Sequence, residues 1–483
     1  MGDLNSVTYK DLILRWADNY STAPDQLKKM VDVKGLISAF NANIDAVIKI
    51  NSKDIEALIQ KFSLNEFNLI QEDKRQIQTM EDAIRGIVHC FKSGIAEEWL
   101  VEDETVYKWL NQEIGYDKLQ MGGQGGIVAN VMAICGVNPV YVHCASLPSI
   151  QAKLFIDRKN LVSVDEKGKL TKAHSIDRQD DTPLVHWIIE FDKGDSLSLA
   201  GEVFICPKSN RFIATYDPLN FKLHIDDHFA NILTKESYQA EIIILSGYQM
   251  LRETLSDGSE GKHRIDKSIK IIENWRSDNK KQIVHLEMAS TQDIAMRNHL
   301  LDTLANKVDS LGFNERELID LLEVMGEKDL VDKCEKESNS INLFEGMLKL
   351  FEYTNAPRLQ LHMFGLYLTM QKKDFIISPS QNKDGMQLAA VIAATKAGTG
   401  AIDNEDILLW ASNKTVSEQG INELRNLSQH INDTLGRNEL LTTGIWANES
   451  FDLIAVPTIL IDKPVTLVGM GDTISSISLV AAR

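Results

Sequence analysis

From residue 241 onward the chain alternates short apolar runs with segments long enough to form helices. The runs cover Ile242 to Leu245, Gln282 to Leu286 and Val308 to Phe313. Short runs that are mainly apolar are typical of strands buried on both faces, and intervening helices make successive strands parallel. The alternation therefore predicts an α/β fold, an αβα doubly wound sheet.

The chain is longer than one such sheet needs, because 483 residues exceed the usual size of a single domain. Between Val140 and Cys206 the pattern changes to short alternating runs with turns at 166–169 and 192–195, which is typical of hairpins. We therefore predict a smaller α/β lid inserted into a large domain. The predicted large domain comprises residues 1–48, 116–150 and 209–483, and the predicted lid comprises residues 49–115 and a β-rich part, 151–208.

The composition indicates which kinds of binding partner the protein lacks. The net charge of −18 argues against a nucleic-acid binder, which needs a basic surface, and no apolar run reaches membrane-spanning length. The five cysteines show no CxxC spacing, which favours a reducing cytoplasm over a disulfide framework or a zinc site. We expect a cytoplasmic protein that binds neither nucleic acid nor membrane.

Near its C-terminus the chain carries a glycine motif. An apolar run at 465–468 breaks at Gly469-Met470-Gly471-Asp472, and the small-residue segment 477–482 follows. This pattern predicts a strand, a tight turn and a helix N-terminus, where backbone N–H groups and the helix dipole attract anions. A carboxylate there can accept a proton from a hydroxyl that attacks a held phosphoryl group. The alternative, with equal weight, is a glycine turn in which Asp472 only caps the helix.

Polar residues follow other apolar runs as well. Asn43 and Asp45 come after the run 35–40 and alternate, so both could face one side and hold vicinal hydroxyls, although an Asx turn, taken alone, explains them better. Glu97 and Glu98 open a new element after a helix that ends at Gly94. The run 122–126, Gly-Gly-Gln-Gly-Gly, precedes a helix and suits close approach of the backbone to a ligand.

Further candidates are single polar residues beside strands. Arg211 suits a phosphate or carboxylate partner, or else a surface ion pair. Glu287 and Glu317, which follows Asn314, could hold Mg²⁺ through water, or else act as helix caps or surface charges. The strand-like run 359–367 carries a His and a Tyr, which are usually core or rim residues.

Taken together, these segments resemble the ADP-dependent sugar kinases, the archaeal glucokinase and phosphofructokinase family of the ribokinase-like superfamily. Seven motifs occur in the family's order: Asn41-Ala42-Asn43-Ile44-Asp45, Gly122-Gly123-Gln124, Asn210-Arg211-Phe212-Ile213, Leu245-Ser246-Gly247-Tyr248, His285-x-Glu287, Asn314-x-x-Glu317 and Gly469-x-Gly471-Asp472. Their order is more specific than any one of them. Met363 follows His362 where the family pattern has Thr.

The resemblance implies a ribokinase-like large domain under a lid, ADP as phosphoryl donor, Mg²⁺, a sugar or sugar phosphate as acceptor, and a monomer or small homo-oligomer. The alternative is an ATP-dependent ribokinase-like kinase of a carbohydrate or nucleoside. The roles implied are the base (Asp472, which also lies near the metal), the anion hole (Gly469 to Asp472, including Gly471), the phosphate clamp (Arg211), metal-ordering carboxylates (Glu287, Glu317), sugar ligands (Asn43, Asp45, Gly123, Gln124 and Glu98, or Glu97 in a register shifted by one) and nucleotide contacts (His362, Tyr367, Asn314).

Overall fold

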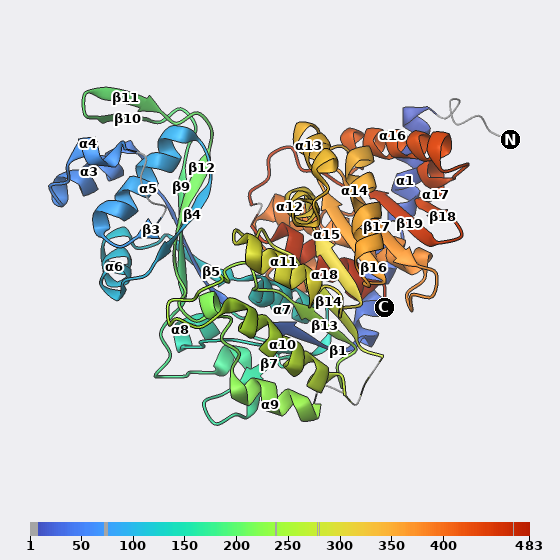
Figure 1. Cartoon of the computed structure of the whole chain (residues 1–483), viewed down its shortest axis with the longest axis horizontal. Helices are drawn as coiled ribbons and strands as arrows, with labels where there is room; N and C mark the ends of the chain where they lie inside the picture. Colours follow the sequence, from blue (N-terminus) through green and yellow to red (C-terminus); the bar gives the residue numbers. More distant parts are fainter. Residues whose placement is uncertain (1–7, 72–75, 237–238, 278, 280, 467) are drawn as a thin grey trace.

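A computed structural model describes residues 8–71, 76–236, 239–277, 279, 281–466 and 468–483. The chain forms a large domain and a smaller one that projects from it (Figure 1). Each has its own sheet and its own buried apolar core. The predicted combination of a doubly wound sheet with a lid is confirmed.

The large sheet has 11 strands in the order β18-β19-β17-β16-β15-β14-β13-β1-β6-β7-β8. Its central strands are parallel and buried on both faces, as the apolar runs predicted. Their carboxyl ends therefore meet at one edge, where ligands bind in open α/β sheets. The strands are β1 (Lys34–Ala39), β6 (Asn138–Val142), β7 (Leu161–Val164), β8 (Leu170–Lys172), β13 (Ile242–Leu245), β14 (Ile283–Glu287), β15 (Ser310–Phe313), β16 (Arg358–Met363), β17 (Leu366–Lys372), β18 (Ile445–Ala447) and β19 (Phe451–Pro457).

Two groups of helices cover this sheet, and within each group every helix contacts the next one. One comprises α9 (Asp227–Glu236), α10 (Gly261–Trp275), α11 (Ile294–Asp302), α12 (Glu315–Met325), α13 (Lys328–Lys336), α14 (Ser340–Tyr353) and α16 (Glu418–Thr434), with α1 (Tyr9–Tyr20) at its end. The other comprises α7 (Gln124–Ile134), α18 (Met470–Ala481), α15 (Pro379–Thr399) and α2 (Ala23–Lys29). Short helices α8 (Ser149–Ala152) and α17 (Leu440–Thr443) lie in connections.

The lid is built on a six-stranded sheet in the order β3-β4-β12-β9-β2-β5. One face packs on α5 and the helices around it, and a two-stranded hairpin, β10-β11, extends the domain. The strands are β2 (Asn43–Lys49), β3 (Gln76–Ile77), β4 (Glu97–Val101), β5 (Lys118–Gly122), β9 (Val185–Phe191), β10 (Ser196–Leu199), β11 (Glu202–Ile205) and β12 (Asn210–Tyr216). The helices are α3 (Ser52–Lys61), α4 (Glu66–Leu69), α5 (Met80–Ser93) and α6 (Glu104–Trp109).

The sheet pairings correct the predicted domain boundaries. Strands β7 and β8, inside the predicted lid segment 151–208, pair with β6 in the large sheet. Strands β2, β5 and β12 contain residues predicted to be in the large domain, but they pair within the lid sheet. The sequence pattern located the hairpin-rich region correctly but did not show which sheet each strand joins.

Two local predictions are also corrected. No strand precedes the glycine motif: the described residues among 465–468 form a bend and a turn, and Leu467 lies outside the described residues. The run 359–367 is not one strand, because β16 and β17 pair antiparallel across a tight turn at Phe364 and Gly365. Gly365 has a φ of 90° there, a conformation that favours glycine.

Within the described ranges, no helix is long and apolar enough to cross a membrane. The five cysteines are all buried, and none of them is in a disulfide bond.

Candidate active site

The glycine motif forms the turn that begins α18. Gly469 has a φ of 62°, and a Cβ on it would lie 2.6 Å from Cδ1 of Ile127. A Cβ on Gly471 would lie 2.8 Å from Nε2 of His362. Only glycine fits these contacts without displacing the neighbours, so the N–H groups of the first helical turn stay uncovered by a side chain. The turn can therefore act as an anion hole.

Asp472 lies in the first turn of α18, where the helix dipole favours a negative charge. Burial raises the pKa of Asp472, while a hydrogen bond from Gln124 and the charge of Lys396 oppose that rise. Gln124 is the first residue of α7, and its Oε1 also accepts a hydrogen bond of 3.3 Å from the Gly247 N–H. The turns after β5 and β13 thus hold the candidate base.

Two further carboxylates, Glu287 and Glu317, lie near Asp472. Burial, together with the charges of Glu317 and Asp472, raises the pKa of Glu287 well above its ordinary value. Burial and the charge of Asp472 raise the pKa of Glu317 to about 8. Glu317 also forms a capping box with Asn314, because its carboxylate accepts a 2.8 Å hydrogen bond from the Asn314 N–H. The same side chain therefore caps α12.

A series of buried, hydrogen-bonded side chains holds Glu287 in place. Arg358, with no exposed surface, donates to Ser310 Oγ at 2.9 Å, which lies 2.9 Å from Nδ1 of His285. The other ring nitrogen of His285 lies 3.1 Å from Oε2 of Glu287. On the opposite side, Nε2 of His362 lies 3.6 Å from Oε1 of Glu287. The carboxylate is therefore fixed from two directions.

The three residues assigned to the nucleotide occupy different surroundings. His362 is packed between Glu287 and the glycine turn. Tyr367 pairs with it across the β16–β17 hairpin and is also buried. Asn314 lines an open pocket of ≈ 610 Å³ with Glu315, Arg316 and Ile319. Their nucleotide roles stay predictions.

The candidate sugar ligands lie where β1 passes into the lid. Asn43 and Asp45 are on one face of β2, as their alternation predicted, and Asn43 Nδ2 donates to Asp45 Oδ1 at 3.0 Å. Oδ1 of Asn43 is buried without a hydrogen-bond partner among the described residues. A Cβ on Gly123, at a φ of 72°, would lie 2.7 Å from that oxygen. An unpaired buried acceptor beside a glycine suits a ligand hydroxyl.

The lid sheet distinguishes Glu98 from Glu97. Oε1 of Glu98 accepts a 2.7 Å hydrogen bond from Thr215, and it lies 3.9 Å from His186 Nδ1. Glu97 points to the opposite face, where it accepts 2.8 Å from Nε1 of Trp99. Because Asp45 pairs with His186 across β2 and β9, Glu98 shares the face that carries the candidate sugar ligands.

His186 is a site residue that the sequence analysis missed. Its Nε2 lies 3.0 Å from Oδ2 of Asp217. Burial alone would lower the pKa of His186, but the hydrogen bond to Asp217 and the charges of Asp217, Glu98 and Asp45 raise it to about 9. Its only sequence signal is its place between Val185 and Trp187, whose side chains pack in the lid core.

Arg211 lies at the start of β12, on the same alternating face as Thr215. Its Nε is buried without a hydrogen-bond partner among the described residues. The strand carries it away from Glu98, because Ile213 is the residue that pairs with Glu98.

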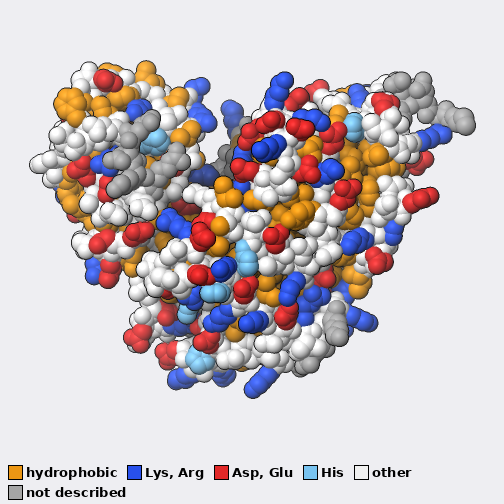
Figure 2. Space-filling view, in the orientation of Figure 1, with side chains coloured by type: hydrophobic (Ala, Val, Ile, Leu, Met, Phe, Trp, Pro, Cys, Tyr) orange, Lys and Arg blue, Asp and Glu red, His pale blue; other side chains and the backbone are white. Residues whose placement is uncertain are grey.

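A cleft separates the lid from the large domain (Figure 2). A cavity of ≈ 860 Å³ in this region is lined by lid residues and large-domain residues: Gln76, Ala96, Glu97, Glu98, Leu100, Gln249, Met250, Leu251, Arg252, Ser290, Gln292 and Asp293. The volume lies within the range of small-molecule sites.

The raised pKa of His186 predicts a pH-dependent contribution to stability. Protonated His186 stabilises the fold fully below the unfolded pKa of about 6.5, and this contribution is lost as the pH rises through about 9. The shift corresponds to at most roughly 3 kcal/mol. Urea unfolding at pH 6, 8 and 10 should show a smaller loss of stability for His186→Asn than for wild type.

His263→Asn, a change at an exposed histidine, is the control and should follow wild type. Parallel curves for wild type and His186→Asn would contradict the expectation.

Comparison with known proteins identifies the family to which this chain belongs. The family model "ADP-specific Phosphofructokinase/Glucokinase conserved region" matches residues 34–481. An ADP-dependent glucose/glucosamine kinase of Pyrococcus abyssi is 30% identical over 97% of this chain and 99% of its own. An ADP-specific phosphofructokinase of Methanosarcina acetivorans is 27% identical over 97% of both chains.

Solved structures agree over the full length. The last common ancestor of ADP-dependent phosphofructokinases from Methanosarcinales has a TM-score of 0.85 and 30% identity over 99% of both chains. An ADP-dependent kinase in complex with fructose-6-phosphate and ADPbetaS has a TM-score of 0.82 and 29% identity over 97% of both chains. The chain belongs to the ADP-specific phosphofructokinase/glucokinase family.

Proposed function

We propose that this protein is an ADP-dependent sugar kinase that transfers the β-phosphoryl group of ADP to a hydroxyl of a hexose or hexose phosphate and releases AMP. The observation that carries the proposal is the placement of Asp472 beside the Gly469–Gly471 turn, within reach of Gln124 at the joint between the two domains. The family's donor is ADP, as its description says.

In this reaction Asp472 accepts the proton of the sugar hydroxyl as the oxygen attacks the β-phosphorus. The bond between that phosphorus and the bridging oxygen breaks, and AMP leaves with the bond's electrons. The N–H groups of the Gly469–Gly471 turn hold the equatorial oxygens of the transferring group. The lid excludes water, which would otherwise accept the phosphoryl group.

We also propose that Glu287 and Glu317 order Mg²⁺, which would neutralise charge on the phosphoryl oxygens. Among the described residues, no three His, Cys, Asp or Glu side chains form a direct metal-binding cluster. Two buried oxygen donors with raised pKa values suit Mg²⁺ nevertheless, because this ion keeps several waters and binds through one or two carboxylates.

Among acceptors, the lid face favours an unphosphorylated hexose such as glucose. Asp45, Glu98 and Asp217 surround His186 on this face, and carboxylates accept hydrogen bonds from hydroxyls but repel a phosphate dianion. Asn43, Asp45, Gly123, Gln124 and Glu98 are the proposed sugar ligands.

Fructose 6-phosphate is the second candidate, because Nε of Arg211 is buried without a partner and a guanidinium suits a sugar phosphate. The related kinase crystallised with fructose-6-phosphate supports this reading.

The first prediction tests the base. Asp472→Ala should lower kcat by roughly 10²–10⁴, the usual contribution of a general base, with little change in the KM of either substrate. Initial rates with glucose and ADP measure the effect. Asp462→Ala, a change at an exposed carboxylate in the preceding segment, is the control. An Asp472→Ala enzyme with most of its turnover would disprove the assignment.

The second prediction concerns the donor. ADP should support kcat/KM at least about tenfold above ATP, since each factor of ten corresponds to about 1.4 kcal/mol of discrimination. Rates are measured at saturating sugar with Mg²⁺ for both nucleotides. Equal values would move the protein to the ATP-dependent class of ribokinase-like kinases.

The third prediction concerns the acceptor. Losing one charged hydrogen bond costs about 1.5–3 kcal/mol, so Glu98→Ala should cut kcat/KM for glucose about 10–100-fold. Any activity on fructose 6-phosphate should fall much less.

Glu97→Ala is the matched control, because its carboxylate points to Trp99 on the opposite face. It should leave the ratio of the two kcat/KM values unchanged. An equal loss for both sugars in Glu98→Ala would show that Glu98 supports the lid rather than the sugar.

A further inference from the structure

One partly buried cation beside the glycine turn has no part in the mechanism above. Lys396 lies in the last turn of α15, and its ammonium reaches the N-terminus of α18. Nζ donates to the carbonyl oxygen of Gly469 at 3.0 Å and to Oγ1 of Thr473 at 3.2 Å. Burial lowers the pKa of Lys396 to about 8, although the charges of Asp472 and Asp45 oppose that shift.

A cation at this position is unfavourable by itself. The N-terminus of a helix carries the positive end of its dipole, and it usually attracts acidic rather than basic groups. Capping would not require Lys396, because Thr473 also donates from Oγ1 to the Gly469 carbonyl, at 2.8 Å. A partly buried lysine at this position therefore indicates that the turn needs a second donor for the Gly469 carbonyl.

The geometry of the peptide unit between Gly469 and Met470 explains this need. A peptide group is planar and trans, so the N–H of Met470 points away from the carbonyl of Gly469. Whatever holds this carbonyl also sets the direction of that N–H. The N–H belongs to the first turn of α18, the proposed anion hole. Gly469 is the residue most in need of such a hold, since its backbone is the least restricted.

We propose that Lys396 is a positioning residue of the phosphoryl-transfer site: by holding the Gly469 carbonyl, it aims the Met470 N–H at the transferring phosphoryl group. The proposal rests on the proposed kinase reaction. It assigns Lys396 no contact with ADP or sugar, so its removal should slow the chemical step and leave substrate binding almost unchanged.

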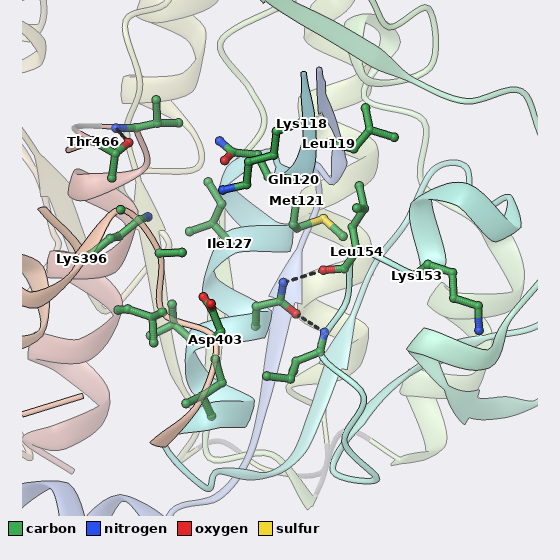
Figure 3. Close-up of a pocket in the computed structure, with 18 residues that line it drawn as sticks. Lys118, Leu119, Gln120, Met121, Ile127, Lys153, Leu154, Lys396, Asp403 and Thr466 are labelled. Carbon is green, nitrogen blue, oxygen red and sulfur yellow. Dashed lines mark hydrogen bonds between the residues drawn. The ribbon is translucent and has the colours of Figure 1, made fainter. Parts of the chain in front are cut away.

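Lys396 is also reachable by small reagents. Its side chain lines a cavity of ≈ 390 Å³ between α7 and the 400–403 segment, with Lys118, Ile127 and Val468 among the other lining residues. Figure 3 shows Lys118 and Lys396 at the same end of this cavity. The five native cysteines are buried, so a cysteine at position 396 can be alkylated selectively.

The test compares Lys396→Met and Lys396→Cys with Lys383→Met. Lys383 is on the same helix, is half-buried and donates to Asn19, far from the turn. We expect kcat to fall about 10–100-fold in both Lys396 variants, less than the roughly 10²–10³ for deleting an oxyanion donor, because the N–H is misdirected rather than removed. The KM values for ADP and glucose should stay within about threefold, and Lys383→Met should match wild type.

Alkylation of Lys396→Cys with 2-bromoethylamine creates a lysine analogue, and it should restore at least half of the lost turnover. Rates are taken where thermal unfolding shows each variant folded. Turnover of Lys396→Met within threefold of wild type would overturn the proposal, as would a failure of alkylated Lys396→Cys to recover. A wild-type protein inactive with ADP would instead overturn the proposed function, so the two failures are distinguishable.

Discussion

The gathering of three carboxylates at one sheet edge, Glu287 and Glu317 buried and Asp472 partly buried, is the constraint on which the site depends. Removing charge from water costs several kcal/mol per group unless partners compensate. Burial raises the pKa values of all three groups, and the charges of Glu317 and Asp472 raise that of Glu287 further. The cations Arg358 and Lys396 oppose the rise at Glu287 and at Asp472, respectively. The cluster therefore keeps negative charge that the protein's own cations do not fully compensate, and a cation bound with the nucleotide would offset it.

The packing of these charged groups explains why two nearby backbone positions must be glycine. Gly312 would place a Cβ 2.1 Å from Oε2 of Glu287, and Gly471 would place one 2.8 Å from Nε2 of His362. Side chains at either position would push the carboxylate or the imidazole out of register. Gly312 in β15 thus serves the packing of the acidic cluster, whereas Gly471 serves both this packing and the approach of an anion to the turn.

The sequence predicted the local parts of this site and missed the non-local ones. The Asn314–Glu317 capping box and the start of α18 near Gly469 were visible because each depends on residues within one helical turn. The pairing of β7 with β6, the β16–β17 hairpin, His186 and Lys396 were not, because each depends on a partner distant in the chain. Alternation placed Asn43 and Asp45 on one face, but only the lid sheet showed that Glu97 and Glu98 have different partners, Trp99 and Thr215.

If the proposed sugar ligands are correct, the same sheet also bears on the choice between the two candidate acceptors. Arg211 precedes Thr215 by four residues on β12, which is roughly 13 Å at about 3.3 Å per residue. Thr215 holds Glu98 beside His186 and Asp217, so the acidic group and the free guanidinium lie at opposite ends of one face. A hexose bound at Asp45 meets the acidic end first, because Asp45 pairs with His186. A phosphorylated sugar must extend toward Arg211 or draw it closer by lid closure. On the proposed sugar site, a neutral hexose would therefore need no change in the lid, whereas a phosphorylated one would require the lid to move.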